Sequence, residues 1–550
     1  MELPRHTPEM IQRYLMKGYW SGTSVLDMYD LHAKVHPDKE ALVAGNTRMT
    51  WAEWKRWVDR VALGLHELGI KPGDVVFRQL PNSAEAILAP LACEKADTIA
   101  CSAVTQLRHQ EVEYILQKAE AVAAIITAEH RKFSYYQMIQ EIKPNLPKLK
   151  YIIVAGDEAP AGTISLNEMA KQPLEEKYPE DYFRQFRIGP GQVARLGVTS
   201  GTTGRPKLVI MPGGAHWGLI HDTMTRWRIT PDSVIGCFAP YVGAGEAPCM
   251  TAFWVGAKVV LLTTIDIEDC LRMINDEKVT LAVGFPPQMA QMLNHPNFDK
   301  YDYSSLECFW YAAVRLPLGV AKDVEEKMGC RIVGMMGAFE GGSITTIAWD
   351  DPTQVRYTSV GKPVFGQEVK LLDENGKEVP TGELGEIRMR GAGCASGYFK
   401  DPEATAAAWI DEPDGWVTSG DLGRFDEDGN LYIVGREKDM INRGGRHIFP
   451  ADVEVVLASH PNVLDAVIVA MPDPIMGEKA CAYVILKPGQ QFTFDEMASF
   501  LQEKDVATYK LPERLEIVGS FPMGGDGQKI LKRELTADIA RKLKEEGVVT

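Results

Sequence analysis

Strand-like and helix-like segments alternate through the first quarter of the chain, and this alternation limits the folds that the chain can adopt. Apolar residues between positions 51 and 68 recur at three- and four-residue steps after Thr50, a suitable N-cap, which predicts an amphipathic helix. Such regular exchange predicts an α/β fold of doubly wound parallel sheets covered by helices. Further strands are expected at residues 75–80, 99–104 and 121–127, and further helices near residues 83–95 and 111–120.

The texture of the sequence changes near Tyr357, where glycines, turns and short β-rich runs replace the alternation. A chain of 550 residues is too long for one ordinary core. We expect a large N-terminal domain over residues 1–438, whose last part, about residues 357–438, forms a small β-rich subdomain. The polar stretch at residues 435–439 marks the boundary, and residues 439–550 suffice for a small α+β C-terminal domain.

Charge and cysteine content exclude several classes of protein. A formal net charge of −16 argues against nucleic acid as the main partner, because neutralising phosphates requires clustered Lys and Arg. The nine cysteines include no C-x-x-C pair, so we expect buried, reduced thiols rather than disulfides or a zinc site. No apolar run reaches the roughly 18 residues of a membrane span, and the first residues lack the features of a secretory signal. We therefore expect a cytoplasmic protein.

The strongest local signal is a run of hydroxyls, glycines and one lysine that follows the apolar stretch at residues 194–198. Glycines allow positive φ angles and close approach, so backbone N–H groups can surround a phosphate, and the hydroxyls and the lysine add donors. The spacing does not match a Walker A loop, and a polar hairpin is the alternative. The predicted phosphate-binding residues are Thr199, Ser200, Gly201, Thr202, Thr203, Gly204 and Lys207.

This run resembles the phosphate-binding signature of the adenylate-forming superfamily, which includes acyl-CoA synthetases, peptide-synthetase adenylation domains and luciferases. Other segments resemble further blocks of that family, in the family's order, and together they cover nearly the whole chain. These blocks lie at residues 337–341, 385–387, 397–399, 416–422, 435–454 and 527–535. The resemblance implies a large AMP-binding N-terminal domain and a C-terminal domain that is mobile.

Each block supplies candidate site residues. Glu340 is a lone carboxylate among glycines, suited to holding Mg²⁺ beside phosphate oxygens, and the resemblance assigns Thr202 to the same ion. The resemblance also implies ribose binding by Asp421 and Arg436, a hinge at Asp439, and a pantetheine tunnel at Gly444 and Gly445. For the glycine pair, a simple turn is the alternative.

Two positions depart from the family pattern. Met336 stands where an aromatic residue usually stacks on adenine, and Phe339, which has no hydroxyl, stands where a threonine usually contacts phosphate. Methionine can still cover the face of an aromatic ring. The expected nucleotide-binding residues of this part of the chain are Val314, Met336, Gly337, Ala338 and Phe339.

Lys529 is the expected catalytic lysine, placed by the resemblance between the substrate carboxylate and the α-phosphate. The family usually has a Gly-Lys pair here, whereas Gln528 separates Gly527 from Lys529 in this chain. Lys532 is therefore a rival. We favour Lys529 because the residues that follow it fall at the family's spacing.

The resemblance implies activation of a carboxylic acid in two steps. The carboxylate attacks the α-phosphorus of ATP, with Mg²⁺, to give an acyl-adenylate and pyrophosphate, and the thiol of coenzyme A, a co-substrate, then attacks the acyl carbon. A stand-alone enzyme that loads a carrier protein is the alternative. A catalytically dead nucleotide-binding protein is the third reading, and the joint presence of Lys207, Glu340, Asp421, Arg436 and Lys529 speaks against it.

A more specific resemblance concerns the acid substrate. Residues 17–20, 441–445 and 509–512 are most similar to the aryl-acid-activating branch, which includes dihydroxybenzoate- and salicylate-adenylating enzymes. That branch carries a His-Asn pair in its acid pocket, and residues 238–243 of this chain lack it. Because buried ring hydroxyls need partners, we expect an unhydroxylated aromatic or alicyclic acid. The expected pocket residues are Tyr241, Val242, Gly243, Val314 and Ala338.

Overall fold

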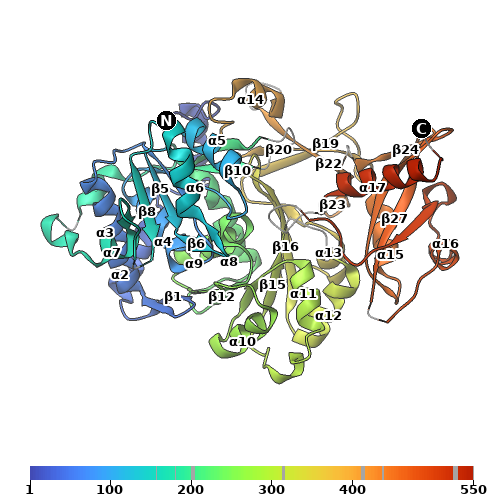
Figure 1. The fold of residues 1–550 in the computed structure, drawn as a ribbon, viewed down its shortest axis with the longest axis horizontal. Coiled ribbons are helices and arrows are strands. Elements are labelled where there is room, and N and C mark those ends of the chain that lie inside the picture. Colours follow the sequence, from blue (N-terminus) through green and yellow to red (C-terminus); the bar gives the residue numbers. More distant parts are fainter. Residues whose placement is uncertain are drawn as a thin grey trace.

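The structure, a computed structural model, describes residues 1–156, 158–179, 181–199, 205–312, 316–410, 415–436, 439–487, 489–523 and 530–548. The chain runs from two large sheets with covering helices, through a smaller sheet, to a C-terminal unit drawn in orange and red at one end of the molecule (Figure 1). This architecture confirms the predicted α/β fold with a smaller α+β part at its C-terminal end.

The first large sheet has seven strands in the order β11-β10-β4-β3-β5-β8-β9. The helices α3 (Trp51–Glu67), α4 (Ala84–Lys95) and α5 (His109–Ala119) confirm the predicted ones, and α3 begins with a capping box of Thr50 and Glu53. Neighbouring strands are parallel except β10 and β11. The strands are β3 (Val75–Gln79), β4 (Ile99–Ser102), β5 (Ala123–Thr127), β8 (Tyr151–Ala155), β9 (Ile164–Ser165), β10 (Val193–Thr199) and β11 (Lys207–Pro212).

The second large sheet has nine strands in the order β18-β17-β16-β15-β14-β12-β13-β1-β2. Its centre, from β16 to β1, is parallel, whereas β2, β17 and β18 are antiparallel edge strands. The predicted parallel sheets thus form the centre of both large sheets, and the antiparallel strands at their edges are a feature that the alternation of strands and helices did not predict. The strands are β1 (Glu40–Ala44), β2 (Thr47–Thr50), β12 (Val234–Cys237), β13 (Lys258–Leu261), β14 (Leu281–Val283), β15 (Cys308–Tyr311), β16 (Arg331–Ala338), β17 (Gly342–Thr346) and β18 (Lys362–Pro363).

Tryptophans of α3 lie in the main apolar core, which both large sheets share. Trp51 and Trp54 are fully buried and stack with ring centroids 5.2 Å apart, and Trp54 meets Phe253 of α9 edge-on at 4.8 Å. This contact joins the two sheets, since α3 leads into the first and α9 belongs to the second. The other helices of this part are α1 (Pro8–Met16), α2 (Val25–Val35), α6 (Tyr135–Ile142), α7 (Leu166–Lys171), α8 (Trp217–Arg226), α9 (Glu246–Val255), α10 (Ile267–Glu277), α11 (Pro286–Leu293), α12 (Leu318–Met328) and α13 (Thr353–Thr358).

A two-stranded sheet of β6 (Glu129–His130) and β7 (Phe133–Ser134) lies in the N-terminal part, and two five-stranded sheets follow later in the chain. The first consists of β19 (Gln367–Leu372), β20 (Gly385–Gly391), β21 (Trp409–Ile410), β22 (Trp416–Phe425) and β23 (Leu431–Arg436), with helix α14 (Pro402–Ala408). The second consists of β24 (Ile441–Arg443), β25 (Arg446–Ile448), β26 (Val463–Asp473), β27 (Gly477–Leu486) and β28 (Arg514–Ile517), with α15 (Pro450–Ala458), α16 (Phe494–Glu503) and α17 (Lys532–Glu545). A domain boundary at residue 438 stays a prediction.

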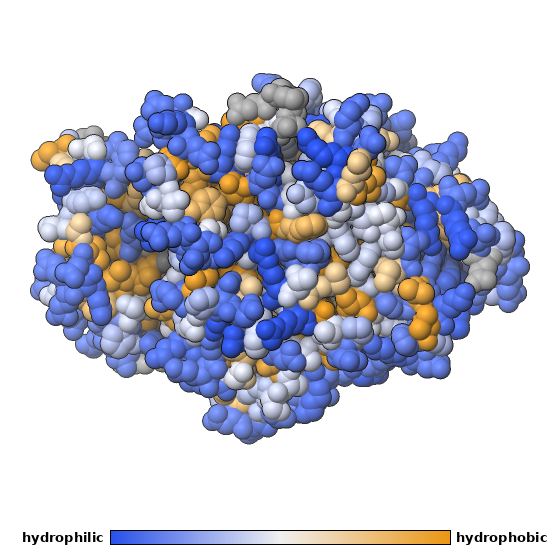
Figure 2. All heavy atoms as spheres, turned by 180° about the vertical axis from the view of Figure 1, so that it is seen from behind, coloured by the Kyte–Doolittle hydropathy of each residue, from blue (hydrophilic) through white to orange (hydrophobic). Residues whose placement is uncertain are grey.

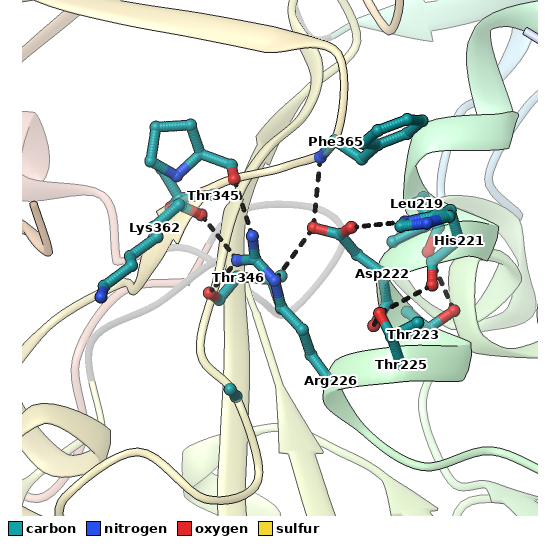
Figure 3. Close-up of polar contacts among 12 residues, drawn as sticks. Leu219, His221, Asp222, Thr223, Thr225, Arg226, Thr345, Thr346, Lys362 and Phe365 are labelled. Atoms are coloured by element: carbon teal, nitrogen blue, oxygen red, sulfur yellow. Dashed lines mark hydrogen bonds and ion pairs between the residues drawn. The ribbon is translucent and has the colours of Figure 1, made fainter. Parts of the chain in front are cut away.

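A buried carboxylate ties α8 to the edge of the nine-stranded sheet (Figure 3). Asp222, only 2% exposed, accepts a hydrogen bond from the backbone N–H of Phe365 (3.2 Å) and pairs with Nε of Arg226 (3.2 Å). The guanidinium of Arg226 in turn donates to the carbonyl oxygens of Thr346 and Pro363, in β17 and β18 (3.2 and 3.0 Å). These bonds fix the strand that follows the predicted 337–341 block.

One face of the molecule is mainly polar. Figure 2 shows a largely hydrophilic face on which apolar side chains lie in separate groups. Among the residues that the structure describes, no helix is both long and apolar enough to cross a membrane. All nine cysteines are buried and unpaired, in agreement with the expectation of buried thiols.

Candidate active site

The predicted phosphate-binding run connects two antiparallel strands. Thr199 ends β10, Lys207 begins β11, and the two residues face each other in the strand register. The run thus connects two antiparallel strands, and its role in phosphate binding stays a prediction. Ser200, Gly201, Thr202, Thr203 and Gly204 lie outside the described residues.

The segment at residues 396–399, which contains one of the family-like blocks, lies beside β11. The N–H of Ile210 donates to the carbonyl of Gly397 (2.9 Å), and the N–H of Phe399 donates to the carbonyl of Leu208 (2.7 Å). Residues almost two hundred positions apart in the sequence thus meet next to the strands that flank the predicted phosphate-binding run.

Tyr398 brings two predicted site residues together. Its hydroxyl donates to Oε1 of Glu340 in the turn between β16 and β17 (2.7 Å), and Nζ of Lys207 lies 4.5 Å from the centroid of its ring. Burial, and secondly the charge of Glu340, raise the pKa of Tyr398 well above its ordinary value, which keeps the hydroxyl protonated as a donor. Sequence reasoning assigned Tyr398 no role, although it lies in one of the quoted blocks.

The predicted adenine-side residues at the end of β16 differ in their exposure to solvent. Gly337 and Ala338 are exposed, whereas Met336 is 8% exposed and belongs to an apolar cluster with Met211 and Met389. Phe339 packs over β10: a β-carbon added to Gly197 would lie 2.5 Å from the Phe339 ring. Phe339 therefore has a packing role at the position where the family usually has threonine. Val314 lies outside the described residues.

The predicted ribose-binding residues form a cross-strand pair. Asp421 on β22 lies opposite Arg436 on β23, with 3.2 Å between Oδ1 and Nε. The backbone N–H of Asp421 also donates to Oγ of Ser419 (3.0 Å). The ion pair orients both side chains on one face of the sheet. This arrangement suits a sugar-binding site, and it suits equally well the alternative, an exposed ion pair without a ligand.

The C-terminal candidates lie in and next to the last sheet. Asp439 is half-buried between β23 and β24. Gly444 and Gly445 connect β24 to β25 with φ values of 59° and 85°, so this turn favours glycine at both positions. The turn alternative is thus realised, and the pantetheine tunnel and the hinge stay predictions.

The structure describes one of the two candidate lysines, Lys532. Lys529 lies outside the described residues. Nζ of Lys532, at the start of α17, donates to Oε1 of Glu454 on α15 (2.7 Å). Glu454 Oε1 also accepts from the backbone N–H of Ile468 (2.8 Å). Lys532 is thus engaged within the C-terminal unit, and Lys529 as the catalytic lysine stays a prediction.

The acid-pocket candidates that the structure describes lie at one end of the parallel strands of the nine-stranded sheet. Tyr241, Val242 and Gly243 follow β12, and Ala338 ends β16, so they lie beyond the carboxyl ends of parallel strands, where ligands of α/β folds usually bind. The backbone N–H of Tyr241 donates to Oδ1 of Asn82 (2.8 Å), and Nδ2 of Asn82 donates to the carbonyl of Ala239 (2.9 Å). Asn82, which sequence reasoning missed, fixes this turn.

Comparisons with known proteins identify the family of the chain. The model of the AMP-binding enzyme family matches residues 29–399, and that of the AMP-binding enzyme C-terminal domain matches residues 452–528. The 2-hydroxy-7-methoxy-5-methyl-1-naphthoate–CoA ligase of Streptomyces carzinostaticus is 31% identical over 544 residues, which cover 97% of this chain and 96% of that protein. The 2,3-dihydroxybenzoate-AMP ligase of Bacillus subtilis (strain 168) is 30% identical over 539 residues, which cover 97% of each.

Solved structures share the fold. The anthranilate CoA ligase AuaEII in complex with anthranoyl-AMP superposes with a TM-score of 0.83 at 26% identity, over 95% of this chain and 98% of that chain. Matching domains, relatives over the whole length and a common architecture lead to one conclusion: this chain belongs to the AMP-binding enzyme family of adenylate-forming ligases.

Proposed function

We propose that this protein is an ATP-dependent acid–thiol ligase that joins a compact aromatic or alicyclic carboxylate to coenzyme A and releases AMP and pyrophosphate. Membership of a family of adenylate-forming enzymes supports the first step. The observation that carries the proposal is the cluster around Tyr398, which gathers a cation, Lys207, and a carboxylate, Glu340, beside the strands that flank the predicted phosphate-binding run.

Glu340 fits Mg²⁺. Its Oε1 accepts from Tyr398, whereas its Oε2 has no hydrogen-bond partner within the described part of the chain. Mg²⁺ is usually held by one or two carboxylates together with phosphates and water, so one available carboxylate oxygen suffices. When bound, the ion would offset the negative charge of the triphosphate.

The other residues bind and align the reactants in this proposal. Lys207 and the predicted phosphate-binding run hold phosphate oxygens, and Asp421 with Arg436 holds the ribose. The acid's carboxylate oxygen bonds to the α-phosphorus as pyrophosphate leaves, and Lys529 neutralises the charge that builds there. The thiol sulfur then bonds to the acyl carbon and AMP leaves, with Asp439 as hinge and Gly444 and Gly445 beside the pantetheine.

A second candidate is an adenylating enzyme that delivers the acyl group to the phosphopantetheine of a carrier protein. One relative is named as a CoA ligase and another as an AMP ligase, so both acceptors are represented at about 30% identity. We favour coenzyme A because residues 238–243 lack the His-Asn pair of the dihydroxybenzoate-type enzymes.

The test is acid-dependent exchange of pyrophosphate into ATP over a panel of aromatic, alicyclic and aliphatic carboxylates, followed by product analysis with coenzyme A or a holo-carrier protein. We expect exchange with compact ring acids and formation of acyl-CoA. Glu340→Ala serves as the inactive control. Absence of exchange with every acid would contradict the proposal, and thioester formation on the carrier protein alone would establish the second candidate.

A further inference from the structure

A second group of charged side chains lies inside the molecule, behind the turn that carries Tyr241. It lines a small cavity between the seven-stranded sheet, α4 and α9. Strands β3, β4 and β10 supply part of its lining, and the two helices supply the rest. The polar residues of this cavity cluster are Arg78, Glu94, Ser102, Arg195, Tyr241 and Glu246.

Part of the cavity cluster is paired. Arg195 Nη1 lies 2.5 Å from Oε1 of Glu246, a close ion pair. The guanidinium of Arg78, which is 2% exposed, donates from Nε to Oγ of Ser102 and from Nη1 to the carbonyl of Ala86, each at 2.5 Å. These bonds hold the two guanidinium groups in fixed positions.

Three polar groups of the cavity cluster are not satisfied. The carboxylate of Glu94 comes no nearer to a cation than the 4.0 Å to Nη2 of Arg195, and no donor reaches it from the part of the chain that the structure describes. Within the same part of the chain, Nη2 of Arg78 and the hydroxyl of Tyr241 have no hydrogen-bond partner either. The side chain of Glu94 is 15% exposed and Arg78 is 2% exposed, and a charge in such a largely buried place gains from a close partner, so this arrangement indicates that a further polar group belongs in the cavity.

The cavity is too small for a whole ring. It has room for about one water molecule, and therefore for one small polar substituent. A hydroxyl fits its chemistry, because it donates one hydrogen bond to Glu94 and accepts others from Arg78 or Tyr241. A second carboxylate would face Glu94 and Glu246, and an ammonium would face Arg78 and Arg195, so both are disfavoured.

We propose that the cavity cluster binds a hydroxyl group at the end of the acid substrate that is remote from its reacting carboxylate, with Glu94 and Arg78 as specificity-determining residues. This inference rests on the proposed function, in which Tyr241 lines the acid pocket. It revises the expectation of an unhydroxylated acid, which considered residues 238–243 alone. The partners for a hydroxyl come instead from β3 and α4, behind Tyr241.

The test measures kcat/KM for pyrophosphate exchange with benzoate, its 2-, 3- and 4-hydroxy derivatives, and 2,3-dihydroxybenzoate. We expect the 3- or 4-hydroxy acid to exceed benzoate at least about tenfold, since a site built to bond a hydroxyl discriminates against the analogue that lacks it. The ratio of kcat/KM for the better hydroxy acid to kcat/KM for benzoate should fall at least about tenfold in Glu94→Gln, which keeps the side chain's shape, and in Arg78→Met. Lys95→Met, at the next position of α4, is the matched control and should keep the ratio.

The outcomes separate this inference from the proposed function. Exchange that favours benzoate over both remote-hydroxy acids, or a ratio that both cluster variants retain, would overturn the inference and leave the ligase proposal intact, with water as the occupant of the cavity. A ratio that falls equally in Lys95→Met would also overturn it, because the effect would then come from packing of α4. Absence of exchange with any acid would contradict the proposed function itself.

Discussion

Two adjacent charged residues near the end of α4, Glu94 and Lys95, lie in opposite situations. Nζ of Lys95, which is 4% exposed, lies 3.0 Å from Oδ1 of Asp30 and also pairs with Asp59. Asp30 has a second partner in Arg187, at 2.9 Å. Within the described residues, the one ion-pair partner of Glu94 is Arg195, at 4.0 Å. The ion pairs of Lys95 tie α4 to α2 and α3, whereas Glu94 lines the small cavity.

The same contrast occurs in the C-terminal unit. Lys532 is bonded to Glu454 of α15 and so contributes to the packing of α17. Lys529 is the lysine that the proposed function assigns to acyl-adenylate formation. A charge whose partners all lie within the chain is thus expected to affect stability when it is removed, and a charge that serves a ligand is expected to affect activity.

Lys529→Ala is the largest expected effect. It should slow acyl-adenylate formation by about 10²–10³-fold, the scale for loss of one group that stabilises the transition state. A supplied acyl-adenylate should still react with coenzyme A at a near-native rate. Lys532→Ala should lower the unfolding midpoint and leave adenylation nearly unchanged. The reverse pattern in pyrophosphate exchange would show that Lys532 is the catalytic lysine.

Lys95→Met tests the cluster of ion pairs around Lys95. Removing this cation leaves Asp30 with Arg187 and Lys55 and leaves Asp59 with Lys55, so each carboxylate loses one partner and the free energy of unfolding should fall by about 2 kcal/mol. Glu94→Gln should change it by less than about 1 kcal/mol, because that carboxylate has no close partner to lose. Urea unfolding of both variants without substrate gives the comparison. Equal losses would mean that the two clusters do not differ in kind.

Tyr398→Phe tests a hydroxyl that has a partner within the chain, Glu340, and that also acts on a proposed ligand through this partner. This hydroxyl orients Glu340, so its removal should raise the Mg²⁺ concentration for half-maximal adenylation about tenfold, the scale for loss of a partner of a metal ligand. The rate at saturating Mg²⁺ should change much less. A lowered maximal rate with an unchanged Mg²⁺ requirement would argue against Glu340 as the metal ligand.

His6 gives the smallest effect. It stacks on Trp20 with ring centroids 5.4 Å apart, and burial lowers its pKa to about 4. The unfolded state therefore binds the proton first, and stability that is complete at high pH is lost as pH falls from about 6.5 toward 4. Local stability of α1 should drop by about 1 kcal/mol between pH 8 and pH 6. Hydrogen exchange in α1, corrected for intrinsic rates, should show this drop, and His6→Phe should abolish it.

Local patterns predicted the elements that depend on neighbours in the sequence. Thr50 and the apolar steps after it gave α3, and the short apolar runs gave β3, β4 and β5, because periodicity and capping act within a few residues. The antiparallel edge strands and the pairing of β1 with β13 were not predictable, since register between distant segments leaves no local trace.

The site residues also fall into those that the sequence predicted and those that it did not. Glu340, Lys207 and the Asp421–Arg436 pair could be named from family-like blocks, and the structure brings Lys207 and Glu340 to Tyr398. The cavity cluster could not be named, because Arg78 and Glu246 come from distant segments. A charged residue inside an apolar strand run, as at Arg78, was the one available signal.

The pairing of residues 396–399 with β11 has a consequence for synthesis of the chain. β11 is the last strand of the seven-stranded sheet, and among the described residues its outer edge is paired with that segment alone. The ribosome makes the covering segment roughly 190 residues after β11, which at common translation rates is about 10–40 s. During that interval the nascent chain presents an unpaired, apolar strand edge, a template for aggregation. Expression at low temperature or with chaperones should therefore raise the soluble yield, and translational pauses between the two segments should lower it.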